Sequence, residues 1–158
     1  MRPMAQKDVP RVHKLLIQYG AKFKLHMHFS PQEVAYFFLP REGVIYSYVV
    51  EDEKDITDFV SFYSLPSSIL KHPEHKTLNA AYSYYNVTTT NRLEELMKDA
   101  LVRARDAGFD VFNCLDLMEN RPCLENLKFG VGDGHLHYYL YNWRIPFLEP
   151  KDVGIVLV

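Results

Sequence analysis

The chain has 158 residues and a mass of 18.5 kDa, a length that suits one domain. It is 47% hydrophobic and 24% charged, with 18 basic and 20 acidic side chains, which excludes a disordered or collagen-like protein and gives no electrostatic footprint for nucleic acid or an anionic membrane. The 11 tyrosines against a single tryptophan are unusual, and they indicate half-buried strands or a groove that combines apolar ring faces with hydroxyl groups.

The apolar runs and the cysteines indicate a cytoplasmic protein. No run approaches the ~20 residues of a membrane helix, and residues 1–4 do not open a signal peptide. Cys114 and Cys123 are too few for a disulfide framework, and we expect two reduced thiols in or near the core. No strong set of further ligands accompanies the histidines, so no metal site is expected.

The amino-terminal part of the chain predicts two helices. Apolar side chains recur at helical spacing between Asp8 and Gly20, with Asp8 as a possible cap and Gly20 as the end of the helix. Residues 30–33 (SPQE) then combine a cap, a proline at the first helical position and a glutamate three residues after the cap, which predicts a capping box. This second helix is expected to end at Pro40.

Three strands are expected next. Residues 44–51 and 56–65 are rich in β-branched and aromatic side chains, and the polar stretch 52–55 between them predicts a hairpin. Residues 78–87 follow as a third strand of the same sheet. Residues 64–68 supply hydroxyl groups where the second strand ends, a position that suits either a ligand or an ordinary polar turn.

The rest of the chain alternates between helices and strands. An apolar stripe over residues 92–107, ended by Gly108, predicts a helix. The further elements expected are a strand at 111–117, a helix at 122–128, a strand at 135–143 and a last strand at 153–158. This order predicts one α/β (α+β) domain over residues 1–158, in which helices cover a mixed sheet.

Residues 130–134 (GVGDG) are similar to a phosphate-binding loop. Such a loop must lead into a helix whose amino end meets the anion, and here a strand is expected instead. We therefore interpret these residues as a turn with positive φ angles that presents Asp133 and backbone amides at its tip.

The carboxyl terminus is unusual, because residues 153–158 (VGIVLV) end the chain on apolar residues without a polar tail. This pattern predicts that the end is packed inside the fold. The α-carboxylate of Val158 would then need hydrogen-bond donors or a cation beside it, and it could serve as a base or as a binding site for a cation. The alternative is a strand whose last atoms reach solvent.

Six stretches of the chain carry a resemblance to a known family. They are residues 58–67 (DFVSFYSLPS), 80–87 (AAYSYYNV), 109–120 (FDVFNCLDLMEN), 128–134 (KFGVGDG), 138–143 (YYLYNW) and 153–157 (VGIVL). Together they closely resemble the carboxyl-terminal half of eukaryotic N-myristoyltransferase. Long blocks in the right order are far more specific than a single short motif.

The resemblance implies a fold and an activity. The family's enzyme consists of two similar halves, each like an N-acetyltransferase (GNAT) fold with a mixed twisted sheet flanked by helices. It transfers myristoyl from myristoyl-CoA to the amino-terminal glycine of proteins. The chain would thus be one half of an enzyme about twice as long, with the amino-terminal half of that enzyme and glycine peptides as its partners.

The resemblance also implies that the co-substrate binds elsewhere. The missing amino-terminal half would hold myristoyl-CoA and the backbone oxyanion hole, so this half is expected to bind no cofactor. The residues agree independently, because an acyl-CoA site needs a glycine-rich junction between the third strand and the next helix. Residues 86–92 (NVTTTNR) contain no glycine.

The resemblance assigns roles to ten positions. The main-chain carboxylate of Val158 would be the general base for the peptide's amino group, and the side chain of Val158 would be incidental. The peptide groove would be lined by Tyr63, Ser67, Leu78, Tyr82, Asp133, Gly134, Leu136, Val156 and Leu157. His135 departs from the asparagine that the family often carries at this position.

Two alternatives belong to other functional classes. The chain could be a non-catalytic peptide-binding module, because it lacks acyl-CoA machinery of its own. It could also be a free-standing acetyltransferase of the GNAT type, which would have to bind CoA measurably.

Overall fold

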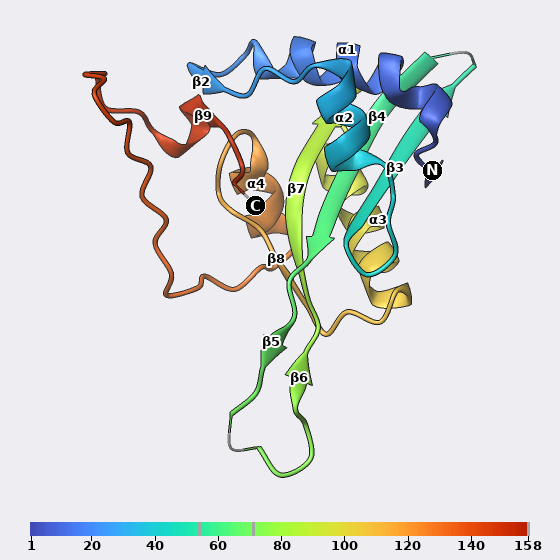
Figure 1. Cartoon of the computed structure of the whole chain (residues 1–158), viewed down its shortest axis with the longest axis vertical. Helices are drawn as coiled ribbons and strands as arrows, with labels where there is room; N and C mark the ends of the chain where they lie inside the picture. Colours follow the sequence, from blue (N-terminus) through green and yellow to red (C-terminus); the bar gives the residue numbers. More distant parts are fainter. Residues whose placement is uncertain (54, 71, 158) are drawn as a thin grey trace.

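The fold is seen in a computed structural model that describes residues 1–53, 55–70 and 72–157. Its centre is a twisted five-stranded sheet in the order β1-β3-β4-β7-β8 (Figure 1). These strands are β1 (Arg2–Pro3), β3 (Ile45–Asp52), β4 (Asp55–Ser64), β7 (Ala80–Thr88) and β8 (Val111–Asn113). Only the β7–β8 pair of this sheet is parallel, so the mixed sheet predicted from the sequence is confirmed.

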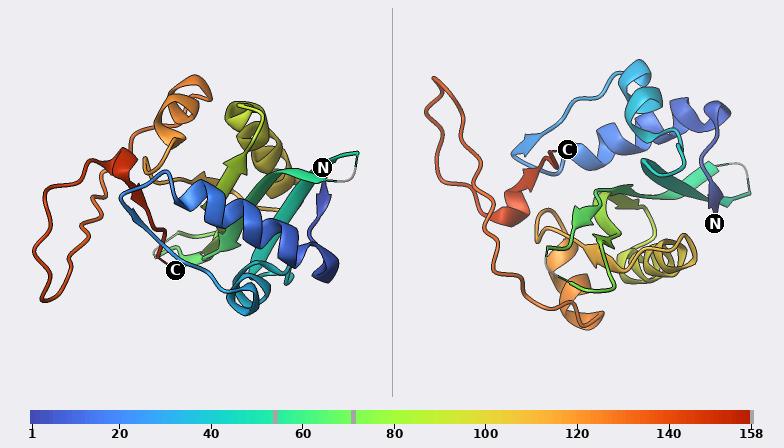
Figure 2. Two further views of the ribbon diagram at one scale, coloured as in Figure 1. Left: turned by 90° about the horizontal axis from the view of Figure 1, so that it is seen from above. Right: turned by 60° about the horizontal axis from the view of Figure 1, so that its bottom comes forward.

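Helices cover both faces of this sheet (Figure 2). One core cluster joins α1 (Val9–Gly20) and α2 (Pro31–Phe38) to the sheet through side chains such as Phe59. A second cluster joins α3 (Leu93–Asp106) to the other face, where Val60 lies. Because neighbouring strand residues point to opposite faces, one strand serves both layers.

Local sequence signals correctly predicted several helix ends. Ser30 and Glu33 form the predicted capping box, in which the Glu33 N–H donates to the Ser30 hydroxyl at 3.2 Å and the Ser30 N–H donates to the Glu33 carboxylate at 2.7 Å. Helix α1 ends at Gly20 as predicted. Gly108 follows α3 with a φ of 82°, a conformation that favours glycine.

The predicted capping role of Asp8 is wrong. Asp8 precedes α1, but its side chain makes no cap hydrogen bond and is fully buried in an ionic cluster. Its carboxylate accepts from Arg2 at 2.6 Å, from Arg11 at 2.8 Å and from the backbone N–H of Ala5 at 2.8 Å. Hydrogen bonding to Arg2 holds the pKa of Asp8 well below its usual value. The residue therefore ties the amino-terminal strand to α1.

The β4 and β7 strands continue into a narrow arm that projects from the body (Figure 1). The arm contains β5 (Ser67–Ser68) and β6 (Thr77–Leu78), an antiparallel pair with Ser67 opposite Leu78. The hydroxyl-rich stretch 64–68 is thus partly strand. Leu78, expected in the third strand, belongs to the arm.

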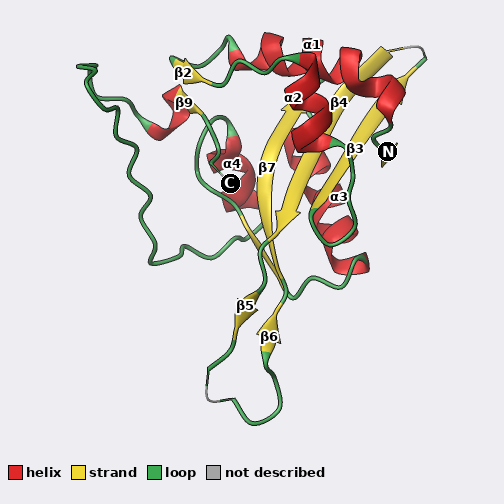
Figure 3. Cartoon of the chain, in the orientation of Figure 1, coloured by secondary structure: helices red, strands yellow, loops and turns green. Residues whose placement is uncertain are grey.

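Several expectations for the last third of the chain are wrong. The strand at 111–117 stops at Asn113, and the helix expected at 122–128 is α4 (Asn120–Asn126). The glycines of 130–134 do not have positive φ, and residues 135–143 form no strand. Figure 3 shows this part of the chain as a long loop. A strand needs a partner for its backbone groups, and residues 130–147, here called the open segment, pair with no strand in the described part of the chain.

The carboxyl-terminal strand is shorter than predicted. After a 3-10 turn, η2 (Pro150–Asp152), only β9 (Val153–Gly154) is a strand, and it pairs in parallel with β2 (Leu25–His26). Val153 and Val156 are buried in the α1–α2 core cluster. In the described residues, no helix has the length and apolar character to cross a membrane.

Candidate functional site

Two tyrosines form the floor of the candidate site. Tyr63 and Tyr82 are directly opposite each other on β4 and β7, and their rings stack with centroids 5.5 Å apart and an interplanar angle of 19°. Both side chains are half-buried. Burial, with a contribution from Tyr82, raises the pKa of Tyr63, so its hydroxyl is neutral near pH 7 and can donate a hydrogen bond.

The arm extends this floor. Ser67 and Leu78 are opposite each other on β5 and β6, only a few residues beyond Tyr63 and Tyr82 on the same two chain segments. Ser67 is exposed and Leu78 is half-buried. The structure therefore brings four of the predicted groove residues onto two successive antiparallel pairs formed by the same two chain segments, with hydroxyl groups beside apolar surface.

The terminal segment, residues 153–157, is held against the body by its main chain. The Val156 N–H donates to the hydroxyl of Tyr85 at 3.3 Å, and this hydroxyl donates in turn to the Gly154 carbonyl at 3.5 Å. The hydroxyl of Tyr138 donates to the Ile155 carbonyl at 2.7 Å. Val156 is buried as predicted, whereas Leu157 is 62% exposed. The predicted base, the carboxylate of Val158, lies outside the described residues.

Gly154 allows the close approach of this segment to the body. A Cβ atom at this position would lie 2.7 Å from Cδ2 of Phe23, closer than side chains tolerate. The ring of Phe23 also meets Tyr19 edge-on at 5.1 Å, so it is fixed from the other side. A glycine is therefore required where the terminal segment passes the end of α1.

Sequence reasoning missed Tyr85 and Tyr138. The only signal for them was the excess of tyrosine, which does not distinguish one tyrosine from another. Burial raises the pKa of Tyr85 to about 12, and burial together with the nearby Tyr63 raises the pKa of Tyr138. Both hydroxyls therefore keep their protons at neutral pH and remain donors.

Asp133, Gly134 and Leu136 lie on the open segment and are exposed. In the described part of the chain, no hydrogen bond or ring contact joins them to Tyr63 or Tyr82. Tyr138, two residues beyond Leu136, is the point where this segment touches both the core and the terminal segment. Their predicted role at the groove stays a prediction.

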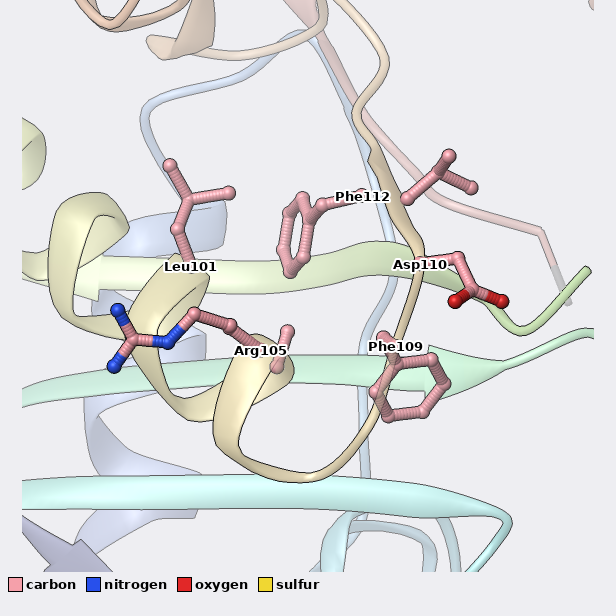
Figure 4. Close-up of a pocket in the computed structure, with 7 residues that line it drawn as sticks. Leu101, Arg105, Phe109, Asp110 and Phe112 are labelled. Carbon is pink, nitrogen blue, oxygen red and sulfur yellow. The ribbon is translucent and has the colours of Figure 1, made fainter.

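The more open hollows of the surface lie elsewhere. Figure 4 shows one of about 190 Å³ between α3 and β8, lined by Leu101, Ala104, Arg105, Phe109, Asp110, Val111 and Phe112. It belongs to the α3 face of the sheet, whereas the terminal segment packs into the core on the α1–α2 face. The candidate site is therefore distinct from this hollow.

The junction before α3 is organised around a buried carboxylate of the protein itself. The carboxylate of Asp58 is buried there and accepts hydrogen bonds from the hydroxyls of Thr57, Thr88 and Thr90. Arg92 pairs with the same carboxylate at 3.6 Å. The hydrogen-bonding capacity of Asp58 is thus used within the protein, and residues 86–92 offer no glycine for the close approach of a pyrophosphate.

Metal and thiol chemistry find no support at this site. Among the described residues, no group of three or more histidine, cysteine, aspartate or glutamate side chains could hold a metal ion. Cys114 and Cys123 are free, and burial raises the pKa of each thiol to about 12 and about 11 respectively. Both thiols are therefore poor nucleophiles.

Comparison with known proteins identifies the family. The model of the family "Myristoyl-CoA:protein N-myristoyltransferase, C-terminal domain" matches residues 1–156. The chain is 52% identical to glycylpeptide N-tetradecanoyltransferase 2 of Bos taurus and 50% identical to glycylpeptide N-tetradecanoyltransferase of Drosophila melanogaster. Each alignment covers 99% of this chain, but only 32% and 34% of those proteins.

Solved structures agree with this relationship. A structure of Saccharomyces cerevisiae N-myristoyltransferase with bound myristoyl-CoA has a TM-score of 0.85 at 33% identity, covering 99% of this chain and 44% of that chain. A ribosomal-protein-alanine N-acetyltransferase from Brucella melitensis has a TM-score of 0.60 at 16% identity, covering 88% of this chain and 97% of that chain, and thus shares the fold. The expected acetyltransferase-like fold is confirmed.

The chain spans about a third of the curated relatives it matches, less than the half that the resemblance implied. The match nevertheless covers nearly all of its own residues and corresponds to one named domain. The chain therefore belongs to the family of the C-terminal domain of myristoyl-CoA:protein N-myristoyltransferase.

Proposed function

We propose that the chain is the peptide-binding part of a protein N-myristoyltransferase, which transfers myristoyl from myristoyl-CoA to the amino-terminal glycine of a protein. Its relatives carry the name glycylpeptide N-tetradecanoyltransferase, and the yeast structure holds myristoyl-CoA. The observation that carries the proposal is the terminal segment, whose main chain is held by Tyr85 and Tyr138 in the core cluster against which Tyr63 also packs. We further propose a cytoplasmic location, with which the two free thiols agree.

In this proposal the groove binds the peptide along the β4–β7 ladder and the arm. Tyr63, Tyr82 and Ser67 offer hydroxyl groups to the peptide backbone, and Leu78 offers apolar wall. Asp133 and the Gly134 N–H, with Leu136, meet a polar or basic side chain further along the peptide. Val156 and Leu157 line the end of the groove that receives the amino terminus.

The terminal carboxylate of Val158 is the proposed base. A free α-amine has a pKa of about 7.7–8.0, so much of it is an ammonium near neutral pH and must lose a proton before it can attack. The carboxylate holds the ammonium and accepts that proton. The amine's lone pair then forms the C–N bond to the acyl carbon and the C–S bond breaks, so that CoA leaves as a thiolate. The nitrogen loses a second proton to become the amide, and the thiolate takes up a proton.

The acyl-CoA site is proposed to lie in the amino-terminal part of the longer protein. The chain covers only 32–38% of its curated relatives, and the junction at residues 86–92 contains no glycine for a pyrophosphate. The open segment supports such a partner, because it exposes large apolar side chains that a folded neighbour would cover. These side chains are Val131, Leu136, Tyr139, Leu140, Tyr141, Trp143, Ile145 and Phe147.

A reconstitution experiment tests this function. The chain is joined to the amino-terminal part of the Drosophila relative, and this joined enzyme is assayed with myristoyl-CoA and a peptide that begins with glycine. The proposal expects transfer to this peptide, no transfer to a matched peptide that begins with alanine, and none by the chain alone. A joined enzyme that is pure and folded but transfers nothing would contradict the proposal.

The alternatives give different results in the same assay. A non-catalytic module would bind the glycine peptide, yet the joined enzyme would remain inactive. A free-standing acetyltransferase would bind CoA and, when acetyl-CoA replaces myristoyl-CoA, the isolated chain would transfer an acetyl group. Transfer by the isolated chain would therefore overturn the assignment of the acyl-CoA site to the missing part.

A further inference from the structure

Two tyrosine hydroxyls from distant parts of the chain hold the main chain of three consecutive residues near the carboxyl terminus. Tyr85 contacts the Gly154 carbonyl and the Val156 N–H, and Tyr138 contacts the Ile155 carbonyl between them. These bonds leave the side chains of the terminal segment out of the interaction. They fix where the backbone lies, whichever residue ends the chain.

We propose that Tyr85 and Tyr138 are positioning residues, which hold the main chain of residues 154–156 and so position the segment that leads to the proposed base. The inference rests on the function proposed above. A chain end is ordinarily the most mobile part of a domain, and a base must stay within hydrogen-bond reach of the proton it takes. Without such a hold, the carboxylate would reach the amine only part of the time.

Tyr85 is itself rigidly placed. Its β7 strand is irregular at this point, because Val60 lies opposite Asn86 while Phe62 lies opposite Ser83. The hydroxyl of Ser61 fills the irregularity, accepting from the Tyr85 N–H and donating to the Tyr85 carbonyl, each at 3.0 Å. The buried ring is also packed edge-on against neighbouring aromatic rings of Phe29, Phe38 and Tyr84. Its hydroxyl is thus a fixed point for the terminal segment.

Tyr138 has a different place, because it comes from the open segment. This segment also carries Asp133 and Leu136, which are proposed to meet the peptide. The bond at 2.7 Å between the Tyr138 hydroxyl and the Ile155 carbonyl ties the two segments together. One of the two holds on the terminal segment therefore comes from the segment that is proposed to meet the peptide.

The prediction for kinetics follows from this geometry. Replacing Tyr85 or Tyr138 with phenylalanine removes one hydroxyl and keeps the ring. Each single substitution is expected to lower kcat of the joined enzyme by about three- to tenfold, and the double substitution by about 100-fold. The KM for the peptide is expected to change little, because neither hydroxyl is proposed to contact the peptide.

The matched control is Tyr84→Phe. Tyr84 is the neighbour of Tyr85 on the same strand and is equally buried, but in the described residues its hydroxyl makes no hydrogen bond to the terminal segment. The substitution removes the same group from the same core. We expect kcat close to that of the unmodified joined enzyme.

A second measurement needs no activity. Hydrogen exchange of the Val156 amide is followed in the isolated chain, by nuclear magnetic resonance, for the unmodified protein and the Tyr85→Phe and Tyr84→Phe variants. The inference expects the Val156 amide to exchange at least about tenfold faster in Tyr85→Phe alone, with core amides unchanged. Faster exchange throughout the core would indicate a general loss of stability and would count against a positioning role.

The outcomes separate the two proposals. If the unmodified joined enzyme transfers myristoyl but the double variant keeps its kcat, the positioning role is wrong and the proposed function stands. If the double variant loses kcat with unchanged KM and a freed Val156 amide, the positioning role is supported. A joined enzyme that transfers nothing overturns the proposed function, and the inference with it.

Discussion

The terminal segment and the open segment lie close in sequence and are both rich in apolar residues, yet they differ in how they are held. Residues 153–156 are held by a β-ladder, a close contact with Phe23 and two tyrosine hydroxyls. The open segment pairs with no strand among the described residues and exposes most of its large apolar side chains. Residues 153–156 are thus held by contacts within the domain. The open segment instead has the exposed apolar surface expected of a contact with another part of a longer protein.

The largest loss of stability is expected from Asp8→Asn, a change in the folded body of the domain. The substitution removes the buried negative charge that Arg2 and Arg11 share, which is expected to cost about 3–5 kcal/mol of unfolding free energy. Urea unfolding of the chain measures this loss. Asp106→Asn is the matched control, since Asp106 is an exposed partner of Arg105, and a change within about 0.5 kcal/mol is expected.

The stability difference between the unmodified chain and Asp8→Asn should also depend on pH. The pKa of Asp8 is lowered in the folded state from an ordinary value of 3.8. Its contribution to stability is therefore present above about pH 4 and is lost as the pH falls below that value. The difference in stability between the unmodified chain and Asp8→Asn should shrink below pH 4, and a constant difference would contradict the ionic account.

Gly154→Ala disrupts the close contact between the terminal segment and Phe23. The new methyl group would meet the ring of Phe23, and we expect a loss of about 1–3 kcal/mol in thermal or urea unfolding. At Gly132 nothing lies within 4 Å of the corresponding position, so Gly132→Ala should have little effect. In a Phe23→Ala background the cost of Gly154→Ala should fall, and strict additivity would show that the two groups do not meet.

The smallest effect on stability is expected in the open segment. Tyr141 and Trp143 are 89% and 75% exposed, so replacing both with serine should change the unfolding free energy of the isolated chain by less than about 0.5 kcal/mol. Binding to the separately produced amino-terminal part should nevertheless weaken. Tyr36→Ser, at an exposed tyrosine of α2, should leave that binding unchanged, and equal losses in both proteins would contradict the assignment.

The parts of the fold that depend on local sequence were predictable. The capping box at residues 30–33 and the helix end at Gly108 are properties of a few neighbouring residues, and the hairpin of β3 and β4 follows from two strand-forming runs around a polar connection. Residues 135–143 also have a strand-forming pattern. Their strand is absent from the described structure because a strand depends on a partner, which the local pattern does not contain.

The site was predictable only in part. Four groove positions suggested by the family resemblance lie together on the β4–β7 ladder and its arm. The roles of Tyr85 and Tyr138 depend on where residues 154–156 cross the core, which the 11 tyrosines in the sequence do not reveal. Asp8 gives the same lesson, because a residue typical of a helix cap is used instead as the centre of an ionic cluster.

The central claim is that the carboxylate at the end of the held terminal segment acts as the base. Its most direct test adds one glycine after Val158 in the joined enzyme, which moves the carboxylate by one residue. Transfer is expected to fall by at least about 100-fold, with a much smaller loss of peptide affinity because the carboxylate is one of several proposed contacts. Val158→Ala keeps a terminal carboxylate and should remain close to the unmodified enzyme. Unchanged turnover in the extended enzyme would contradict the account.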